Sequence, residues 1–315
     1  MECVPFESSA GFNYSSLGQW LADAPGTVAT MLKRWDLRAG DAFIGGIAGA
    51  VIAVTCSDGT AAVLKVAYPH AEGTWEAVGL QLFASGGAPA VLKQDAWTWS
   101  MLLAPVTPGV TLAAADTTPR DALVAGGRLR AALTAAESSD AQASALRASV
   151  PLLRDAMRNY AALGRAREQT QAAALDDLGV RSLVSAALDD LEHLTTTGPT
   201  GHLVHGDYNP GNILDAGDGR WVAIDPKPLD GDPAYDLWPL VSQLGDPFGA
   251  AVPAARLASQ LRIAAEAAEC DAVRAARWSW ARAGLNVSWY LAEGQRSRAV
   301  DAAAELRAWA TVVGY

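Results

Sequence analysis

Three polar side chains in the second half of the chain have the types and the spacing of a magnesium–phosphate site. Asp207 and Asn212 stand close together in one segment, and Asp225 ends a short apolar run further along. In phosphoryl transfer, one carboxylate accepts the proton of the attacking hydroxyl, while an amide and a second carboxylate hold the magnesium ion that neutralises the phosphates. The order of these residues therefore predicts Asp207 as the proton acceptor and Asn212 and Asp225 as the metal ligands.

The residues around this set predict a local fold that would bring the three side chains together. Pro210 and Gly211 favour a tight turn, which would return the chain so that Asn212 lies beside Asp207. Residues 213–224 hold two apolar runs around a centre rich in Gly and Asp, which predicts a hairpin that carries the second aspartate to the same place. These residue types are also common in ordinary loops. The hairpin and the second aspartate together favour the functional interpretation.

The same segment resembles a superfamily of small-molecule kinases. Residues 205–212 read His-Gly-Asp-Tyr-Asn-Pro-Gly-Asn, residues 224–228 read Ile-Asp-Pro-Lys-Pro, and residues 231–236 read Gly-Asp-Pro-Ala-Tyr-Asp. This set is similar to the aminoglycoside phosphotransferase superfamily, and in particular to its branch of streptomycin 6-phosphotransferases and hydroxyurea kinases. The resemblance implies that Asp236 braces the catalytic loop. The ring of His205 is expected to brace the same loop rather than to move a proton.

The order of expected elements fits the fold that the resemblance implies, an α+β, bilobal, protein-kinase-like fold. Strands are expected at residues 41–44, 50–56, 61–67, 90–93 and 97–103. A helix is expected at 72–83, after a helical lead-in up to residue 40, and the Pro-rich segment 104–109 is the expected linker. Most of 110–200 and 253–313 is expected to be helical, with one helix starting at Thr118 and Pro119, one near 149–151 and one over 176–194. We therefore expect a β-rich N-lobe at 1–104 and a helical C-lobe at 105–315.

A lysine in the third expected strand is the candidate for contact with nucleotide phosphates. Lys65 ends the run Ala-Ala-Val-Leu-Lys, so its ammonium could reach phosphates as a point charge. Such a lysine needs a carboxylate on the next helix to orient it. Glu76 is the first choice, because it precedes the apolar face of that helix, and Glu72 is the second.

Two further segments are candidates for nucleotide binding. Gly45 and Gly46 lie between the first two strands, where a backbone without side chains could approach phosphates. A plain hairpin turn is the alternative, because the segment is neither a Walker A loop nor a Rossmann fingerprint. Leu103 and Ala104, at the expected hinge, could offer backbone groups to the purine. The sequence at this hinge does not distinguish ATP from GTP.

Candidates for contact with the acceptor substrate come from two places. Lys227 follows the second aspartate in the sequence Asp-Pro-Lys, and it could touch phosphate or acceptor, or pair with Asp230. One helix face further along has an i, i+3, i+4, i+7 spacing that suits a flat or cationic ligand, and its members are Asn286, Trp289, Tyr290 and Glu293. Aromatic residues at helical spacing are also common in cores, which is the alternative for this face.

Composition limits the class of protein and its partners. The net charge of −10 disfavours nucleic acid and anionic membranes as partners, and half of the 315 residues are hydrophobic, enough for a sizeable core. Cys3, Cys56 and Cys270 follow no metal or disulfide spacing, which favours a cytoplasmic location. The first residues lack signal-peptide character, and the longest apolar run, 42–56, is shorter than the ~20 residues of a membrane-spanning helix. The oligomeric state stays open.

Together these features predict an enzyme that uses ATP (or GTP) and Mg²⁺ to phosphorylate a hydroxyl of a small molecule. The resemblance implies an antibiotic-resistance kinase for a streptomycin-like aminoglycoside, and a nucleoside antibiotic such as capuramycin is a further possible acceptor. A metabolic sugar or amino-sugar kinase is one alternative, and a non-catalytic nucleotide-binding regulator is another. A protein kinase is disfavoured because no Ala-Pro-Glu motif follows Asp225.

Overall fold

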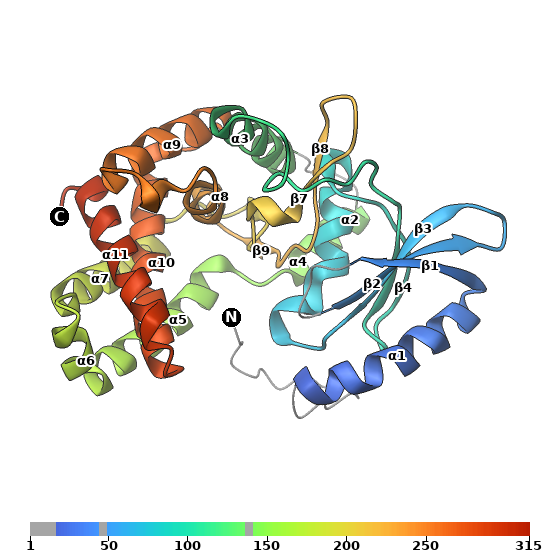
Figure 1. The fold of residues 1–315 in the computed structure, drawn as a ribbon, viewed down its shortest axis with the longest axis horizontal. Helices are drawn as coiled ribbons and strands as arrows, with labels where there is room; N and C mark the ends of the chain where they lie inside the picture. The colour runs from blue at the N-terminus through green and yellow to red at the C-terminus, as the bar shows by residue number, and fades with distance from the viewer. Residues whose placement is uncertain (1–16, 44–48, 136–140) are drawn as a thin grey trace.

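The computed structural model describes residues 17–43, 49–135 and 141–315 and has two lobes (Figure 1). The N-terminal lobe contains a five-stranded sheet, and the larger C-terminal lobe is mainly helical. The predicted α+β, bilobal fold class is therefore confirmed. Among the described residues, no helix is both long enough and apolar enough to cross a membrane.

The N-lobe sheet is antiparallel, in the order β1-β2-β3-β5-β4. Its strands are β1 Leu37–Phe43, β2 Gly49–Cys56, β3 Ala61–Ala67, β4 Val91–Asp95 and β5 Ser100–Leu103. The first strand begins earlier than the predicted 41–44, since Asp36, at a positive φ of 53°, ends the preceding helix. This edge strand is mostly exposed, so its sequence lacks the apolar alternation that reveals half-buried strands.

Two helices cover the two faces of this sheet. Alternate residues of a strand point to opposite faces, and one face packs on α1 (Leu17–Arg34), burying Trp20, Met31, Leu64, Val66 and Leu102. The other face packs on α2 (Glu76–Gly87), burying Leu80, Met101 and Leu103. Lys65 shares the α2 face with its strand neighbour Val63. The pleat therefore directs the Lys65 ammonium toward the first turn of α2, which follows a short 3₁₀ helix, η1 Ala71–Trp75.

The segment between the lobes is attached to the C-lobe before the first C-lobe helix starts. The Leu112 amide donates to the Ile213 carbonyl at 2.7 Å, and the Asp215 amide donates to the Val110 carbonyl at 2.8 Å. Ile213 and Asp215 bound β7, which pairs with β8 (Trp221–Ala223) as the predicted hairpin. The second half of the linker thus runs beside this hairpin.

The C-lobe is built from helices around one large hydrophobic core. Its helices are α3 Pro119–Ala135, α4 Ala141–Ser149, α5 Leu153–Thr170, α6 Ala172–Asp177, α7 Arg181–Thr197, α8 Leu237–Gln243, α9 Pro253–Ala267, α10 Ala272–Ala292 and α11 Arg296–Val313. The helix predicted over 176–194 is split, because Gly179 has a positive φ of 64° between α6 and α7. The short α8 was not predicted.

Short strands and 3₁₀ turns position the catalytic segments within this lobe. β6 (Leu203–Val204) pairs antiparallel with β9 (Leu229–Asp230). The 3₁₀ turn η2 (Pro210–Asn212) lies within the motif at 205–212, η3 (Pro233–Asp236) lies within the motif at 231–236, and η4 (Pro247–Gly249) follows α8. Both ends of the segment that carries the motifs are therefore fixed by backbone pairing.

Candidate active site

The loop between β6 and β7 places Asp207 and Asn212 side by side. Asn209 caps η2 by accepting the Gly211 amide at 2.9 Å, which tightens the turn after Asp207. The Asn212 side-chain nitrogen then donates to the Asp207 carbonyl at 3.0 Å. Because that nitrogen is held by the loop, the side-chain oxygen of Asn212 is the atom that could bind a cation.

The carboxylate of Asp207 lies between an amide and an ammonium. Its Oδ1 accepts from Asn209 Nδ2 at 3.1 Å, and its Oδ2 lies 3.3 Å from Lys227 Nζ. Burial alone would raise the pKa of the Asp207 carboxyl, but the Lys227 charge and the Asn209 hydrogen bond outweigh burial and lower it. Asp207 is therefore ionised at neutral pH, the state that a proton acceptor requires.

The backbone of this loop is held by a buried carboxylate. Asp236 accepts from the His205 amide at 2.7 Å and from the Gly206 amide at 2.9 Å. Asp236 also forms an ion pair with Arg130 of α3, at 2.7 Å, and both side chains are fully buried. The Arg130 guanidinium donates in turn to the Leu203 carbonyl at 2.7 Å. Asp236 thus has the bracing position that the resemblance implied.

The ring of His205 connects the catalytic loop to the hairpin. Its Nε2 donates to the Ile224 carbonyl at 3.0 Å, and its Nδ1 accepts the Asp207 amide at 3.3 Å. Burial lowers the pKa of the imidazole, which keeps the ring neutral, as this pair of contacts requires. Since both nitrogens are engaged with the backbone, His205 has the structural place expected for it.

Gly206 is the residue that allows the two motifs to come together. Its φ is 81°, and a Cβ at this position would lie 2.0 Å from the Lys227 carbonyl oxygen. The Lys227 amide donates to the His205 carbonyl at 2.8 Å, so the two backbones touch here. Only glycine combines this positive φ with this close approach.

Lys65 lies between two carboxylates at the boundary of the lobes. Its Nζ is 2.6 Å from Glu76 Oε1 and 2.8 Å from Asp225 Oδ1. Burial alone would lower the pKa of the Lys65 ammonium, but the two carboxylates outweigh burial and raise it. Lys65 is therefore firmly charged. Glu76, the first-choice partner, is in contact with it, whereas Glu72 pairs with Lys227 instead.

Asp225 faces the space between the lobes, beside the loop. It has a positive φ of 57°, its side chain is 46% exposed, and the preceding Ile224 amide donates to the Asn212 carbonyl at 2.9 Å. The described residues contain no group of three His, Cys, Asp or Glu side chains that could enclose a metal. Mg²⁺ in phosphate-binding sites usually takes one or two protein oxygen ligands and completes its shell with water and phosphate. The donor set of Asn212 and Asp225 fits such an ion.

Comparison with known proteins identifies the family. The profile described as aminoglycoside/hydroxyurea antibiotic resistance kinase matches residues 34–294. The chain belongs to this family. It is 31% identical over 304 residues to a streptomycin 6-kinase from Streptomyces glaucescens, and the alignment covers 95% of this chain and 93% of that protein. It is 29% identical to a hydroxyurea phosphotransferase from Kitasatospora aureofaciens, covering 88% of this chain and 76% of that protein.

Solved structures show the same fold. A thermostable mutant of aminoglycoside phosphotransferase APH(4)-Ia, in complex with ADP and hygromycin B, superposes with a TM-score of 0.62 at 19% identity, covering 91% of this chain and 98% of that chain. A choline/ethanolamine kinase family protein from Mesorhizobium loti gives 0.60 at 18% identity, covering 92% and 94%. The family match and the named kinase relatives show that this protein is a kinase of small molecules. Nucleotide use agrees with the ADP bound in the APH(4)-Ia structure.

In this kinase, α2 approaches the hairpin closely at a residue that sequence reasoning missed. A Cβ on Gly79 would lie 2.9 Å from the Pro226 side chain and 3.0 Å from that of Pro228. This contact sets the distance between the helix that carries Glu76 and the segment that carries Asp225. The available signal was a glycine inside an otherwise good helix, which often marks close packing.

In this kinase, Lys227 pairs with Glu72 and Asp207 and not with Asp230. Its Nζ lies 3.2 Å from Glu72 Oε2 and 3.3 Å from Asp207 Oδ2. The suggested pair with Asp230 is wrong, because Asp230 is paired with Arg147 at 3.4 Å and accepts the Gly201 amide at 2.8 Å. Asp230 belongs to β9, where it lies opposite Leu203 of β6.

The other predicted nucleotide contacts are at Gly45, Gly46, Leu103 and Ala104. Gly45 and Gly46 lie outside the described residues. Leu103 is buried at the end of β5, and the Ala104 amide donates to the Ala90 carbonyl at 2.9 Å, so this amide is already engaged.

Of the four predicted acceptor residues, Asn286, Trp289 and Tyr290 lie on the last turns of α10 and Glu293 directly follows its end. Arg167 of α5 lies over the Trp289 ring at 4.5 Å, and Arg298 of α11 lies over the Tyr290 ring at 5.8 Å. Asn286 is half-buried and Glu293 is exposed. The turn of α10 that meets the catalytic side comes earlier, where Arg282 donates to the Tyr235 carbonyl of η3 at 3.0 Å. Sequence reasoning missed Arg282 because arginine is common on exposed helix faces.

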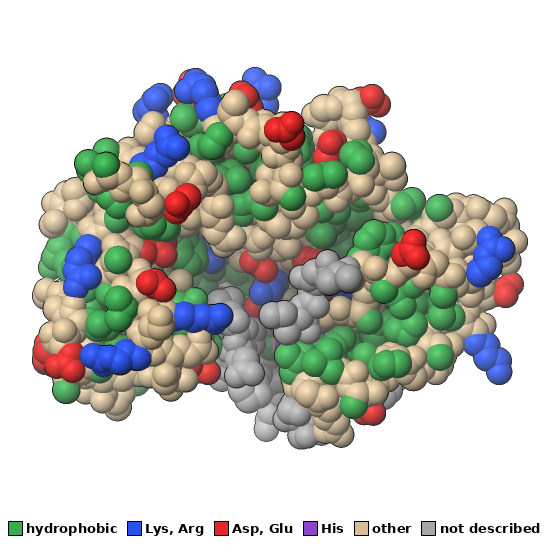
Figure 2. Space-filling model, viewed as in Figure 1, with side chains coloured by type: hydrophobic (Ala, Val, Ile, Leu, Met, Phe, Trp, Pro, Cys, Tyr) green, Lys and Arg blue, Asp and Glu red, His purple; other side chains and the backbone are tan. Residues whose placement is uncertain are grey.

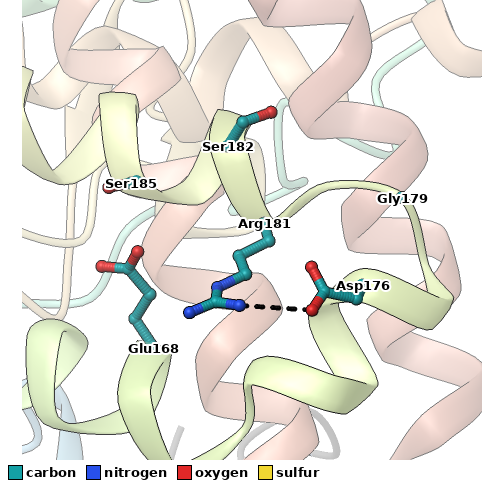
Figure 3. A pocket seen from close by; sticks show the side chains of 6 residues that line it. All are labelled: Glu168, Asp176, Gly179, Arg181, Ser182 and Ser185. Atoms are coloured by element: carbon teal, nitrogen blue, oxygen red, sulfur yellow. Dashed lines mark hydrogen bonds and ion pairs between the residues drawn. The ribbon is translucent and has the colours of Figure 1, made fainter.

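Two hollows of the kinase differ in character. Figure 2 shows acidic and basic side chains gathered in the hollow between the lobes. A second, open hollow of about 550 Å³ lies at α5, α6 and α7 and is lined by Glu168, Asp176, Gly179, Arg181, Ser182 and Ser185 (Figure 3). There Arg181 is paired with Asp176 at 3.2 Å. None of its lining residues belongs to the site around Asp207, so we do not assign the acceptor to it.

Proposed function

We propose that this kinase transfers the γ-phosphoryl group of ATP to a hydroxyl of an antibiotic, with a streptomycin-like aminoglycoside as the first candidate acceptor. The relatives named as streptomycin 6-kinase and hydroxyurea phosphotransferase support this class, and a nucleoside antibiotic such as capuramycin is a second candidate acceptor. The observation that carries the proposal is a series of contacts across the lobes: Lys65 pairs with Asp225, the neighbouring Ile224 amide donates to the Asn212 carbonyl, and the Asn212 side chain donates to the Asp207 carbonyl.

In the proposed reaction, Asp207 orients the acceptor hydroxyl and takes its proton. The acceptor oxygen bonds to the γ-phosphorus while the bond from that phosphorus to the bridging oxygen of ADP breaks. Because the charge of Asp207 is held by Asn209 and Lys227, the carboxylate is fixed in place before the acceptor arrives. Most of the acceleration then comes from positioning and from charge neutralisation.

On the nucleotide side, Lys65 binds phosphate oxygens and Glu76 keeps its ammonium in place. Asn212 and Asp225 would hold Mg²⁺, which supplies charge neutralisation on the phosphates. Gly45, Gly46, Leu103 and Ala104 remain proposed contacts of the nucleotide. The boundary that we propose between the lobes, 104/105, follows the hydrogen bond that ties Ala104 to the N-lobe.

On the acceptor side, Lys227 is the proposed contact closest to Asp207. Four residues at the end of α10 remain proposed acceptor contacts because of their helical spacing: Asn286, Trp289, Tyr290 and Glu293. The Trp289 and Tyr290 rings already lie under guanidinium groups, and such rings can bind a cationic ligand in the same way.

The test is a mass-spectrometric screen for phosphoryl addition. The full chain is incubated with ATP and Mg²⁺ and with streptomycin, other aminoglycosides, hydroxyurea, capuramycin and simple sugars, each in parallel with Asp207→Asn. We expect a gain of one phosphoryl group on streptomycin with the wild-type protein and a rate about 10²–10⁴-fold lower with the variant. Turnover of sugars alone would replace the antibiotic with a metabolic acceptor. Full activity of Asp207→Asn would refute the proton-acceptor role.

A further inference from the structure

The ammonium of Lys227 is shared almost equally between two carboxylates from different lobes. Glu72 Oε2 of η1 lies 3.2 Å from Nζ, and Asp207 Oδ2 of the catalytic loop lies 3.3 Å from it. The three side chains are 22%, 35% and 26% exposed for Glu72, Asp207 and Lys227, so they border the hollow between the lobes. An ammonium at this position is beside the carboxylate to which an acceptor hydroxyl must come.

The N-lobe end of this bridge is itself fixed by the C-lobe. The Tyr160 hydroxyl, on α5, donates to Glu72 Oε1 at 2.8 Å. The two oxygens of one N-lobe carboxylate therefore meet two C-lobe side chains. Because η1 leads directly into α2, the segment that holds Glu72 continues into the helix that holds the partner of Lys65.

The backbone of Lys227 is also fixed by contacts within the C-lobe. Its amide donates to the His205 carbonyl at 2.8 Å, and its carbonyl oxygen lies against Gly206. Prolines stand on both sides of it, at 226 and 228, and both touch α2 at Gly79. A lysine has a flexible four-carbon stem, so without a second partner its ammonium would sample many positions over this fixed backbone.

We propose that Glu72, oriented by Tyr160, is a positioning residue that holds the Lys227 ammonium across the hollow, beside Asp207 and facing the path of the transferred phosphoryl group. This inference rests on the proposed function, because it assigns a place within that site. Among the described residues, Lys65 pairs with Glu76 and Asp225, and Lys227 pairs with Asp207. A cation held there would stabilise negative charge on the transferred group without any rearrangement during the reaction.

The kinetic test uses Glu72→Gln, Tyr160→Phe and Lys227→Met, alone and in pairs. Because misplacement of a catalytic group costs up to about 100-fold, we expect Glu72→Gln to lower kcat by roughly 10–100-fold, with the KM for ATP nearly unchanged. Tyr160→Phe removes one hydrogen bond to a carboxylate and should lower kcat by roughly fivefold. Lys227→Arg, which keeps the charge, should retain more activity than Lys227→Met.

The decisive readout is the coupling between these variants. If Glu72 and Tyr160 act through Lys227, neither substitution lowers kcat further in a Lys227→Met protein. Additive losses would overturn the proposal, because they would show that Glu72 acts independently of Lys227. Two substitutions serve as matched controls. Glu192→Gln changes a glutamate that pairs with Arg165 on the surface, and Tyr315→Phe changes an exposed tyrosine at the end of the chain. Both controls should leave kcat unchanged.

A measurement without any acceptor separates this proposal from the proposed function. Hydrogen exchange of the apo full-length protein, followed by mass spectrometry, reports on η1 through the Gly73 and Glu76 amides, which donate within that turn. Glu72→Gln and Tyr160→Phe should accelerate exchange in this peptide, while the two controls should not. If the wild-type protein phosphorylates none of the acceptors, the proposed function fails, and the exchange of the η1 peptide alone tests the role of Glu72. Exchange that is unchanged in Glu72→Gln and Tyr160→Phe would then overturn the proposal that these contacts hold η1 against the C-lobe.

Discussion

Two lysines of this protein make the same kind of connection in different ways. Each joins a glutamate of the N-lobe to an aspartate of the C-lobe: Lys65 contacts Glu76 and Asp225, and Lys227 contacts Glu72 and Asp207. The Lys65 contacts are 2.6 and 2.8 Å and its side chain is 8% exposed, whereas the Lys227 contacts are 3.2 and 3.3 Å and its side chain is 26% exposed. In the first bridge the lysine and the glutamate are buried and only the Asp225 end is open to solvent, whereas all three side chains of the second are partly exposed. We call them the buried bridge and the open bridge.

The difference follows from where each lysine stands. Lys65 comes from an interior strand that is hydrogen bonded on both sides, so its stem leaves a rigid surface toward α2. Lys227 comes from a loop segment whose side chain reaches across the hollow. The comparison suggests two ways of fixing a lysine: Lys65 is held by burial within the N-lobe, while Lys227 is held at a more exposed place by contacts to both lobes.

The largest stability effect should come from breaking the buried bridge. Lys65→Met leaves the buried Glu76 carboxylate without its cation, and removing one partner of a buried pair costs about 3–5 kcal/mol. Burial already raises the pKa of Glu76, so protonation of this residue should keep the loss at the lower end of that range. Urea unfolding of the variant measures it, and Lys33→Met, at the end of α1, is the control. A loss below about 1 kcal/mol would show that this bridge is no more important for stability than a surface pair.

Gly206→Ala should have the next largest effect, because the catalytic loop and the Lys227 segment touch at this residue. The added Cβ would lie 2.0 Å from a carbonyl oxygen, at a φ of 81°. Strain of this kind costs about 2–4 kcal/mol, and the displaced loop should also lower kcat. Gly59→Ala is the matched control, because its φ of 86° is similar while its Cβ would meet nothing within 4 Å. Equal losses at both glycines would assign the whole effect to backbone strain.

Gly79→Ala should change the buried bridge with little change in stability. Alanine favours a helix over glycine by about 1 kcal/mol, which offsets part of the clash with the two prolines at 2.9 and 3.0 Å. The displaced α2 should move Glu76 away from Asp225 and raise the KM for ATP, while the KM for the acceptor stays the same. Steady-state kinetics with either substrate varied would distinguish these effects, and an unchanged KM for ATP would contradict this account of Gly79.

The smallest stability effect is expected at the open bridge. Lys227→Met breaks two partly exposed contacts, and such pairs contribute about 0–1 kcal/mol. The same urea experiment as for Lys65→Met should therefore give a much smaller loss, even though kcat falls in both variants. Comparable losses of stability in the two variants would remove the contrast between the bridges.

The parts of the site that could be predicted are those set by neighbours in sequence. The turn at Pro210 and Gly211 places Asn212 beside Asp207 through local hydrogen bonds. Lys65 and Glu76 meet because one strand is followed directly by the helix that packs on it. In both cases the fold is decided within a few residues or by one strand-to-helix connection.

The parts that could not be predicted depend on contacts between distant segments. Glu72 was a reasonable alternative partner for Lys65, but it contacts Tyr160 and Lys227 instead, two residues far from it in sequence. The edge strand β1 has no apolar alternation. The short α8 directly follows the 3₁₀ turn η3, and most of its residues are buried in the C-lobe. The acceptor residues on α10 have a clear periodicity, but periodicity does not say which neighbour covers a face.

The hydrogen bonds at the two ends of the linker have a mechanical consequence. Ala104 is bonded to Ala90 in the N-lobe, and Gly109 is bonded to Asp215 in the hairpin, so residues 105–108 form the pivot between two anchored points. Proline fixes φ at both 105 and 108, which leaves this pivot few torsion angles to vary. We therefore expect the backbone connection to act as a short, stiff joint that limits how far the two lobes can separate.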